Sequence, residues 1–406
     1  MSLLPVEEAR RRVLEGAGPV SRTESVPLRA SRGRVLAVDL AARRSQPGFD
    51  ASAMDGYAVR AADAATGSIL AVLGEAAAGH GWEGSVGEGE ALRIFTGAPL
   101  PAGADAILIQ EDTEPAGEGR IRVTESPAPA AHIRRAGIDF AEGAILMRAG
   151  TRLTSGAVAL AASGGYPDLQ VLARPRIAIL ATGDELVLPG DALGPHQIVA
   201  SNTFGIAALV EENGGEVLDC GIAPDDESAI AARFDEAYEA GADVFVTIGG
   251  ASVGDHDLVG KVFADRGVEL DFWKVAMRPG KPFMAGRKGA MRIAGLPGNP
   301  ASSLVAATLF LAPLVRRLAG LADRPFTREG VLRADMPANG ARANFVRAVF
   351  EGEDEAGRPR LLPLGKQDSS LLSVYARADG LLMRPVDAPA AKAGDPCLYV
   401  PLGLDG

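Results

Sequence analysis

Short apolar runs alternate with stretches of helical length between residues 174 and 320, and this alternation constrains the fold more than any other feature of the chain. Apolar runs of strand length are typical of strands buried on both faces, and their alternation with helices predicts a doubly wound parallel sheet with helices on each side. The expected strands are 176–180, 216–220, 243–248, 270–275, 283–285 and 291–294, and the expected helices are 203–213, 227–240, 257–265 and 301–319. Pro313 should kink the last of these helices.

Three glycine-containing loops follow strands of this predicted sheet. The segment Leu296-Pro-Gly-Asn-Pro300-Ala-Ser302 opens the last helix, where Pro300 suits the first turn, Asn299 can cap free N–H groups and Gly298 allows close backbone approach. The other two loops are Ala181-Thr-Gly-Asp-Glu185 and Gly249-Gly-Ala-Ser-Val-Gly254. One such loop is more often a plain turn. Three of them at the carboxyl edge of one sheet predict a cradle for an anion and indicate a phosphate-bearing ligand.

Charged and hydroxyl side chains accompany these loops. Thr182 and Ser252 add hydroxyl donors, and Lys281 adds a positive charge. Six acids also follow strands of the sheet: Asp184, Glu185, Asp225, Asp226, Asp255 and Asp257. Because carboxylates repel a phosphate unless a hard cation lies between them, we predict Mg²⁺ here. The alternative is helix capping, which is favoured for Asp226 and stays open for Glu185, Asp225 and Asp257.

Composition excludes several classes of protein. The 406-residue chain carries a formal charge of −11 with no offsetting basic block, which argues against nucleic acid or an anionic membrane as partner. The small arginine clusters, such as 10–12 and 316–317, are expected on solvated faces. Two distant cysteines exclude a disulfide framework and a structural zinc site, and the longest apolar run, 304–315, is too short to span a bilayer. We therefore expect a cytoplasmic protein that does not bind a membrane.

The rest of the chain is expected to be rich in β-structure. Residues 45–136 carry short apolar runs between Gly, Pro and acidic turns, which predict a small β unit, and residues 334–399 predict a β-barrel or sandwich. Two loops in the first of these regions, 47–58 and 96–105, are dense in turn formers. The four histidines are scattered, and no serine–histidine or cysteine–histidine constellation supports covalent catalysis.

These motifs together resemble the MoeA family, the molybdopterin molybdenumtransferases related to the E domain of gephyrin. The matching segments fall in order along nearly the whole chain, at 47–58, 95–105, 182–186, 249–257, 272–282, 296–302 and 371–382. The resemblance implies a multidomain α/β plus β protein. It has an elongated discontinuous linking domain (1–44 and 137–172), an inserted β domain (45–136), a molybdopterin-binding α/β domain (173–325) and a C-terminal β-barrel domain (326–406). It also implies a homodimer whose active cleft lies between the α/β domain of one subunit and the N-terminal half of the other.

The reaction implied is insertion of molybdate into adenylylated molybdopterin, with release of AMP. A molybdopterin adenylyltransferase would then be the upstream partner, and Mg²⁺ would bind through Glu185, Asp225 and Asp257. Catalytic roles carry over to Asp55, Thr96, Asp139, Glu185, Asp225, Asp257, Lys274 and Lys281. Substrate-binding roles carry over to Thr182, Gly183, Asp184, Gly249, Gly250, Ser252, Gly254, Pro279, Gly280, Pro297, Gly298, Asn299, Pro300 and Ser302.

Two other readings stay open. A scaffold that binds partner peptides, as gephyrin's E domain does, would keep this fold without turnover. A generic Mg²⁺-dependent nucleotide-processing enzyme would also use a doubly wound domain with phosphate-binding loops. The complete set of acidic and glycine positions favours the molybdenumtransferase, because a scaffold need not retain them together.

Overall fold

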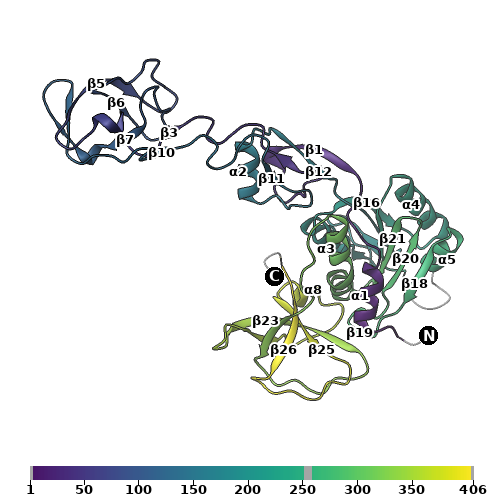
Figure 1. The fold of residues 1–406 in the computed structure, drawn as a ribbon. Helices are drawn as coiled ribbons and strands as arrows, with labels where there is room; N and C mark the ends of the chain where they lie inside the picture. The colour runs from purple at the N-terminus through teal and green to yellow at the C-terminus, as the bar shows by residue number, and fades with distance from the viewer. Residues whose placement is uncertain (1–2, 251–257, 404–406) are drawn as a thin grey trace. The chain divides into compact units, whose positions relative to one another are not determined.

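The computed structural model describes residues 3–250 and 258–403. The chain forms two compact units (Figure 1). The first unit combines residues 1–24 with residues 172–406, and the second comprises residues 25–171. Each unit has its own hydrophobic cores, so they are described in turn.

The central sheet of the first unit has six strands in the order β16–β13–β17–β21–β20–β18. In that order they span Glu216–Ala223, Arg176–Thr182, Val244–Ile248, Met291–Leu296, Met284–Lys288 and Glu269–Trp273. The connecting helices are α3 (Ser201–Glu212), α4 (Glu227–Glu239) and α5 (Leu258–Asp265), visible around the sheet in Figure 1. A short parallel pair, β14 (Leu186–Val187) and β15 (Ile198–Val199), precedes α3.

Helices cover both faces of this sheet, as the alternation of strands and helices predicts. Ile177 and Ile179 of β13 are buried in a core that also contains residues of α3 and of the last helix of the domain. The intervening residues Ala178 and Leu180 point to the opposite face and pack with residues of α4 and α5. The doubly wound arrangement is therefore confirmed, and it follows from the period-2 alternation of side chains in a doubly buried strand.

The expectation of a fully parallel sheet is wrong at one edge. Strands β16, β13, β17 and β21 run parallel, but β20 is antiparallel to β21 and β18 is antiparallel to β20. Only Gly289 and Ala290 separate β20 from β21. Two residues can close a hairpin, whereas a parallel connection needs a crossover of a dozen residues or more.

The last helix of the domain contains a π-helical turn. It runs as α6 (Pro300–Ala306), the π-turn η4 (Ala307–Leu311) and α7 (Ala312–Leu318). Pro313 lacks the N–H that would bond the Leu309 carbonyl in an α-helix, and the guanidinium of Arg10 donates to that carbonyl instead. The helix has the length and hydropathy of a membrane span, but 78% of its apolar window is buried inside the protein. It is a core helix.

The N-terminal helix belongs to this unit. Val6, Ala9 and Val13 of α1 (Val6–Leu14) are buried in the same core as α7. Helix α1 therefore packs with the α/β domain, in the same compact unit. The apolar stripe of α1 explains this placement, since three buried side chains on one face need a partner surface.

The C-terminal part of the first unit is a barrel, as the resemblance implies. Strands β22 (Arg328–Leu332), β23 (Ala343–Glu353), β24 (Pro359–Pro363), β25 (Gly380–Arg384) and β26 (Pro396–Pro401) form one sheet. Because β23 pairs with both β24 and β25, the five strands close on themselves. The short strand β19 (Met277–Arg278) adds to β23, and helix α8 (Leu372–Tyr375) lies between β24 and β25 in the chain.

The second unit contains two regions. In one, β1 (Thr23–Pro27) pairs with β12 (Asp168–Leu172) and β2 (Leu40–Ala41) pairs with β11 (Ile145–Met147), beside helix α2 (Ser155–Ser163). Segments from both ends of the unit thus share one core, which contains Val26, Leu36 and Met147.

The other region is the six-stranded sheet that the sequence predicts as a β unit. Its strands, in spatial order, are β7 (Ala106–Ile109), β4 (Gly56–Val59), β6 (Glu90–Ile94), β5 (Ile69–Ala76), β9 (Arg120–Val123) and β8 (Thr113–Pro115). The minor elements of the second unit are η1 (Leu28–Ala30), which packs beside α2 in the first region, and η2 (Ala61–Asp63), η3 (Gln110–Asp112) and the pair β3 (Ala51–Ser52) with β10 (Ile133–Arg134). Two buried clusters pack on the two faces of the six-stranded sheet, so this region has hydrophobic cores of its own.

Candidate active site

Four parallel strands end at the same level of the central sheet. Thr182, the last residue of β13, pairs with Ala223, the last residue of β16. The neighbouring pairs are Ala181 with Ile248 and Ile248 with Leu296, so β17 and β21 end there too. The register therefore brings the three predicted glycine loops to one edge, where open α/β sheets bind ligands.

A cleft of about 1100 Å³ opens at this edge, and we call it the strand-end cleft. Thirteen of the predicted site residues line it: Thr182, Gly183, Glu185, Asp225, Gly249, Gly250, Lys274, Lys281, Pro297, Gly298, Asn299, Pro300 and Ser302. Asp184, Pro279 and Gly280 do not line it. Ser252, Gly254 and Asp257 lie outside the residues that the structure describes.

The glycine loop after β17 depends on the absence of a side chain. Gly249 has φ +96°, and a Cβ added there would lie 2.7 Å from the Thr182 carbonyl oxygen. At Gly250, with φ +62°, a Cβ would lie 2.4 Å from a methyl group of Val259. The Gly249 N–H donates to the Leu296 carbonyl oxygen at 3.2 Å, which ties this loop to the end of β21. Only glycine permits this packing of one loop against another.

The loop after β21 is held by residues that the sequence did not single out. Asn202 of α3 donates through Nδ2 to the Gly298 carbonyl oxygen at 2.7 Å, and its buried Oδ1 has no partner among the described residues. The buried hydroxyl of Thr182 likewise has no partner among them. Polar atoms in this state at a cleft are available to a ligand. The signal for Asn202 was the polar triplet Ser201-Asn-Thr203 at a helix start.

The prediction that Asn299 caps the last helix is wrong. Asn299 is the N-cap residue, but its side chain makes no capping bond and instead donates to Ser369 Oγ at 3.1 Å. The backbone of the same segment also reaches Ser369, whose carbonyl oxygen accepts from the Ala301 N–H at 3.0 Å. The segment between β24 and α8, which contains Ser369, is therefore bound to the start of α6. Its next residue, Ser370, lines the cleft. Pro300 stands at the first turn, as predicted.

Two lysines enter the cleft from one loop. The Lys274 N–H donates to the Phe283 carbonyl and the Val275 N–H donates to the Lys281 carbonyl, both at 3.0 Å, so Lys274 and Lys281 are fixed across the loop from each other. Lys274 has φ +81°, a left-handed conformation that is uncommon for a residue with a side chain. The N-terminal Leu4 stabilises it, because its N–H donates to the Lys274 carbonyl oxygen at 3.2 Å. Backbone strain of this kind is typical of functional sites.

The acids that the sequence predicts at this sheet edge have different roles. Asp226 caps α4 by accepting from the Ala229 N–H at 2.8 Å, which confirms the capping reading. Asp184 accepts from the Asp225 N–H at 3.1 Å and so orders the neighbouring loop. Glu185 and Asp225 line the cleft itself. Within residues 3–250 and 258–403, no group of three or more His, Cys, Asp or Glu side chains is placed to hold a metal by itself. Two carboxylates beside a phosphate site nevertheless fit Mg²⁺, which takes its other ligands from phosphate and water.

Comparison with known proteins decides the family. Three family profiles cover most of the chain: the MoeA N-terminal region (domain I and II) matches residues 4–165, a probable molybdopterin binding domain matches residues 178–317, and the MoeA C-terminal region (domain IV) matches residues 329–402. A molybdopterin molybdenumtransferase of Haemophilus influenzae is 33% identical over 398 residues, which is 97% of each chain. The chain belongs to the MoeA family.

Other relatives agree with this MoeA assignment. Molybdopterin molybdenumtransferase 2 of Mycobacterium tuberculosis is 37% identical over 401 residues, covering 95% of this chain and 97% of the relative. The crystal structure of a MoeA protein from Pyrococcus horikoshii matches with a TM-score of 0.83 and 30% identity, over 98% of this chain and 99% of that one. Apart from Ser370, the residues that line the strand-end cleft lie within the segment matched by the probable molybdopterin binding domain.

The remaining site residues of this MoeA chain lie in the second unit. Asp55 Oδ1 accepts from both the backbone N–H and the hydroxyl of Thr96, each at 2.8 Å. The backbone N–H, then the hydroxyl, hold the pKa of Asp55 below its ordinary value, so this exposed carboxylate stays ionised. Asp139 is exposed, and its N–H donates to the Gln46 carbonyl oxygen at 3.0 Å. The structure thus brings Asp55 and Thr96 together and does not link Asp139 to them by a hydrogen bond.

Proposed function

We propose that this chain inserts molybdenum, supplied as molybdate, into adenylylated molybdopterin with release of AMP, and so completes the molybdenum cofactor. The observation that carries the proposal is the strand-end cleft, where two lysines, two carboxylates and main-chain glycine loops surround one space. Full-length similarity to molybdopterin molybdenumtransferases supports this reading of the cleft.

In this proposal the main chain binds the phosphates. The loops at Gly249 and Gly298 bring backbone into the cleft, the second at the positive N-terminus of α6, and Lys274 and Lys281 neutralise the anionic groups that lie there. Molybdate is a dianion and needs the same kind of positive, N–H-rich contact before the dithiolene sulfurs of the pterin take the metal. The protein therefore acts by placing two anionic substrates against each other, which is catalysis by proximity.

Glu185 and Asp225 are the residues that would hold Mg²⁺ in this cleft. The resemblance also implies Asp257 as a magnesium ligand, but Asp257 lies outside the residues that the structure describes. Magnesium would offset the repulsion between these carboxylates and the pyrophosphate of the substrate. Asp184 would position one of these two magnesium ligands, because it accepts a hydrogen bond from the Asp225 N–H and so fixes the loop that carries the Asp225 carboxylate.

An assay with purified protein tests the function directly. Incubation with adenylylated molybdopterin, molybdate and Mg²⁺ is expected to release AMP and to form a cofactor that activates an apo-molybdoenzyme. Chelation of divalent cations should stop AMP release, and added Mg²⁺ should restore it, because the carboxylates would then be uncompensated. Tight binding of a partner peptide without AMP release would favour the scaffold reading. Hydrolysis of unrelated nucleotides would favour the generic nucleotide enzyme.

Changing Leu4 tests the placement of the cleft lysines. Leu4→Pro removes the N–H that bonds the Lys274 carbonyl, so Lys274 should leave its left-handed conformation and the KM for adenylylated molybdopterin should rise about tenfold. Leu4→Ala keeps that N–H and serves as the matched control, with KM close to the wild-type value. Steady-state kinetics and thermal unfolding separate this effect from a loss of stability. Equal KM values for both variants would show that the N-terminal segment does not position the lysine.

We also propose a homodimer with a shared active site. Large apolar side chains are exposed around both parts of the site. In the first unit they are Leu188, Leu193, Ile198 (57% exposed), Val199 and Phe204 (55% exposed), of which Ile198 and Val199 line the cleft. In the second unit they are Phe49, Met54 and Ile138 (66% exposed), each next to an aspartate in the sequence. Apolar surface gathered at a polar site is typical of an interface with another chain.

The chemistry of the substrate defines the neighbouring step in the pathway. An adenylylated pterin must come from an adenylyl-transferring enzyme, so a molybdopterin adenylyltransferase is the proposed upstream partner.

We propose a cytoplasmic location. The support for it is that both cysteines, Cys220 and Cys397, are free thiols, as in a reducing compartment.

A further inference from the structure

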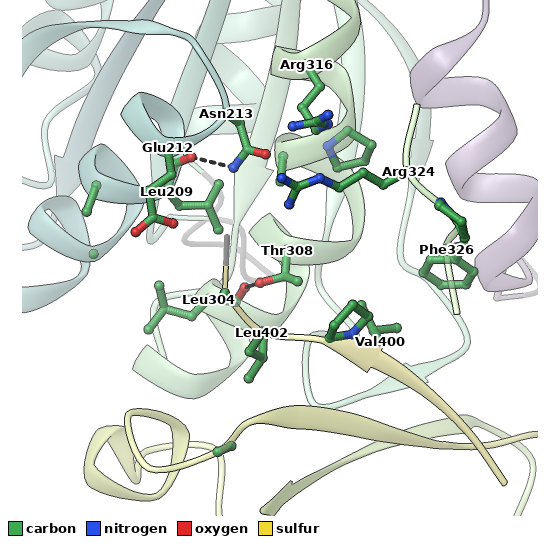
Figure 2. Close-up of a pocket in the computed structure, with 18 of the residues that line it drawn as sticks. Leu209, Glu212, Asn213, Leu304, Thr308, Arg316, Arg324, Phe326, Val400 and Leu402 are labelled. Carbon is green, nitrogen blue, oxygen red and sulfur yellow. Dashed lines mark hydrogen bonds between the residues drawn. The ribbon is translucent and has the colours of Figure 1, made fainter. Parts of the chain in front are cut away.

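A second cavity of about 590 Å³ lies in the first unit (Figure 2), and its lining residues differ from those of the strand-end cleft. We call it the arginine cavity. Its walls come from α1, α3, the α6–α7 helix, residues 323–328, α8 and the end of β26. None of the residues that the structure describes lines both cavities. A volume in the range of roughly 300–1,000 Å³ is typical of small-molecule sites.

One part of the lining is apolar and neutral. Figure 2 shows Leu209 of α3, Leu304 of α6 and Leu402 after β26 around the same space. In the same lining the Tyr375 hydroxyl and Thr308 Oγ1 form a hydrogen bond of 2.9 Å. Burial raises the pKa of Tyr375 to about 12, so the phenol carries no charge. This part can accept the apolar body of a ligand.

The other part of the lining is cationic. Among the described residues, five arginines and two carboxylates line the cavity: Arg10, Arg316, Arg317, Arg324 and Arg328, with Glu212 and Asp323. This excess is unusual in a chain with a formal charge of −11. The expectation that residues 10–12 and 316–317 only form solvated faces is therefore wrong for Arg10, whose guanidinium lies 3.9 Å from the centre of the Phe326 ring. Clustered positive charge in a cavity attracts anions.

Hydrogen bonds fix the cationic wall in place. Arg317 forms an ion pair with Asp323 at 2.7 Å, and Arg316 donates to the Ala322 carbonyl oxygen at 2.9 Å, so the segment after α7 is tied to the helix. Arg10 connects the same segment to the π-turn, because it contacts Phe326 and bonds the Leu309 carbonyl. Preformed walls of this kind lower the entropic cost of binding a ligand.

One arginine of this wall, Arg328, is not held by the contacts that fix the others. Arg328 of β22 is exposed and lines the cavity, and among the described residues its side chain has no hydrogen-bond or ion-pair partner. Its guanidinium can therefore bind an anionic group without first losing another contact. A guanidinium pairs most strongly with the planar or tetrahedral oxygens of carboxylate, sulfonate or phosphate.

We infer that the arginine cavity is a second ligand site, which takes a small organic anion whose apolar body packs on the leucines while its acidic group pairs with Arg328. The site is separate from the strand-end cleft and independent of the proposed transfer reaction. It shares only the helices α3 and α6 with that cleft, at later turns of each.

Two matched dyes test both halves of this inference. The fluorescent probe 8-anilinonaphthalene-1-sulfonate carries an aromatic body and one anionic group, and N-phenyl-1-naphthylamine has the same rings without the charge. The sulfonate is expected to bind the full chain at least about tenfold more tightly than the neutral dye. Arg328→Gln should weaken the sulfonate about fivefold and leave the neutral dye unchanged, the size of one charge-assisted contact at an exposed site. Arg360→Gln removes an exposed arginine of the same barrel that does not line the cavity, and it should change neither.

A substitution that fills the arginine cavity tests whether the dyes bind there. Ala208→Phe places a ring at an exposed position that lines the cavity, and it should weaken both dyes about tenfold or more. Ala232→Phe makes the same change at an exposed position of α4 outside the cavity and should have no effect. Thermal unfolding checks that both variants fold. Equal affinity for the two dyes, no effect of Ala208→Phe, or displacement of the sulfonate by AMP would each overturn the inference, the last because it would place the dye in the strand-end cleft.

Discussion

A mixture of Asp55→Ala and Glu185→Ala subunits is expected to recover about a quarter of the wild-type activity, although each variant alone should lose at least about 100-fold. If one site is built from the α/β domain of one subunit and the N-terminal half of the other, a mixed dimer keeps one site in which both carboxylates are intact. Half of the dimers in a random mixture are mixed, and each has one working site of two. AMP release from co-expressed, differently tagged subunits measures this recovery.

The matched control combines Glu185→Ala with Lys281→Ala. Both residues line the same cleft of the first unit, so every site of a mixed dimer lacks one of them and no activity should return. Purification on one tag and then on the other isolates the mixed dimers and confirms that they have formed. Inactivity of the Asp55→Ala and Glu185→Ala mixture, despite mixed dimers, would refute the shared site and leave the exposed apolar side chains around it unexplained.

Gly249→Ala is expected to abolish tight binding of adenylylated molybdopterin while the protein stays folded. The new Cβ would lie 2.7 Å from the Thr182 carbonyl oxygen, so the loop must move away from the end of β13. A loop displaced by about 1 Å can lower activity roughly 100-fold when it positions a substrate. Calorimetric titration with the substrate, beside urea unfolding, measures the two effects separately.

Gly190→Ala separates this clash from backbone strain. Gly190 has φ +97°, almost the same as Gly249, but a Cβ there would contact nothing within 4 Å. Both variants should lose about 1–2 kcal/mol of unfolding free energy, since alanine is strained at positive φ. Only Gly249→Ala should lose substrate binding. If Gly190→Ala lost it equally, general destabilisation and not loop geometry would be the cause.

The loops of the cleft were predictable because their signals are local. Gly249, Gly298 and Pro300 stand within a few residues of the ends of apolar runs, and a strand followed by a glycine turn and a helix start favours one local geometry. Capping of α4 by Asp226 was predictable for the same reason. Asn299 shows the limit of this reasoning, because a distant partner, Ser369, takes the side chain that the helix end could have used.

Other features required contacts between distant segments. Asn202 reaches Gly298 across 96 positions in the chain, and Leu4 reaches Lys274 across an even longer stretch. Nothing near either residue in the sequence specifies such a partner. The arginine cavity likewise depends on Arg10 crossing to Leu309, whose carbonyl is free because Pro313 has no N–H.

The sequence by itself determined the buried strands, the glycine loops that follow them and the membership of the MoeA family, because hydrophobic periodicity and the conformations open to glycine and proline are properties of short segments. The tertiary structure decided the direction of β20 and β18, the packing of α1 with the α/β domain, the left-handed Lys274 and the second cavity. These features depend on which surfaces pack together, and the free energy of burying one segment against another cannot be predicted from either segment alone.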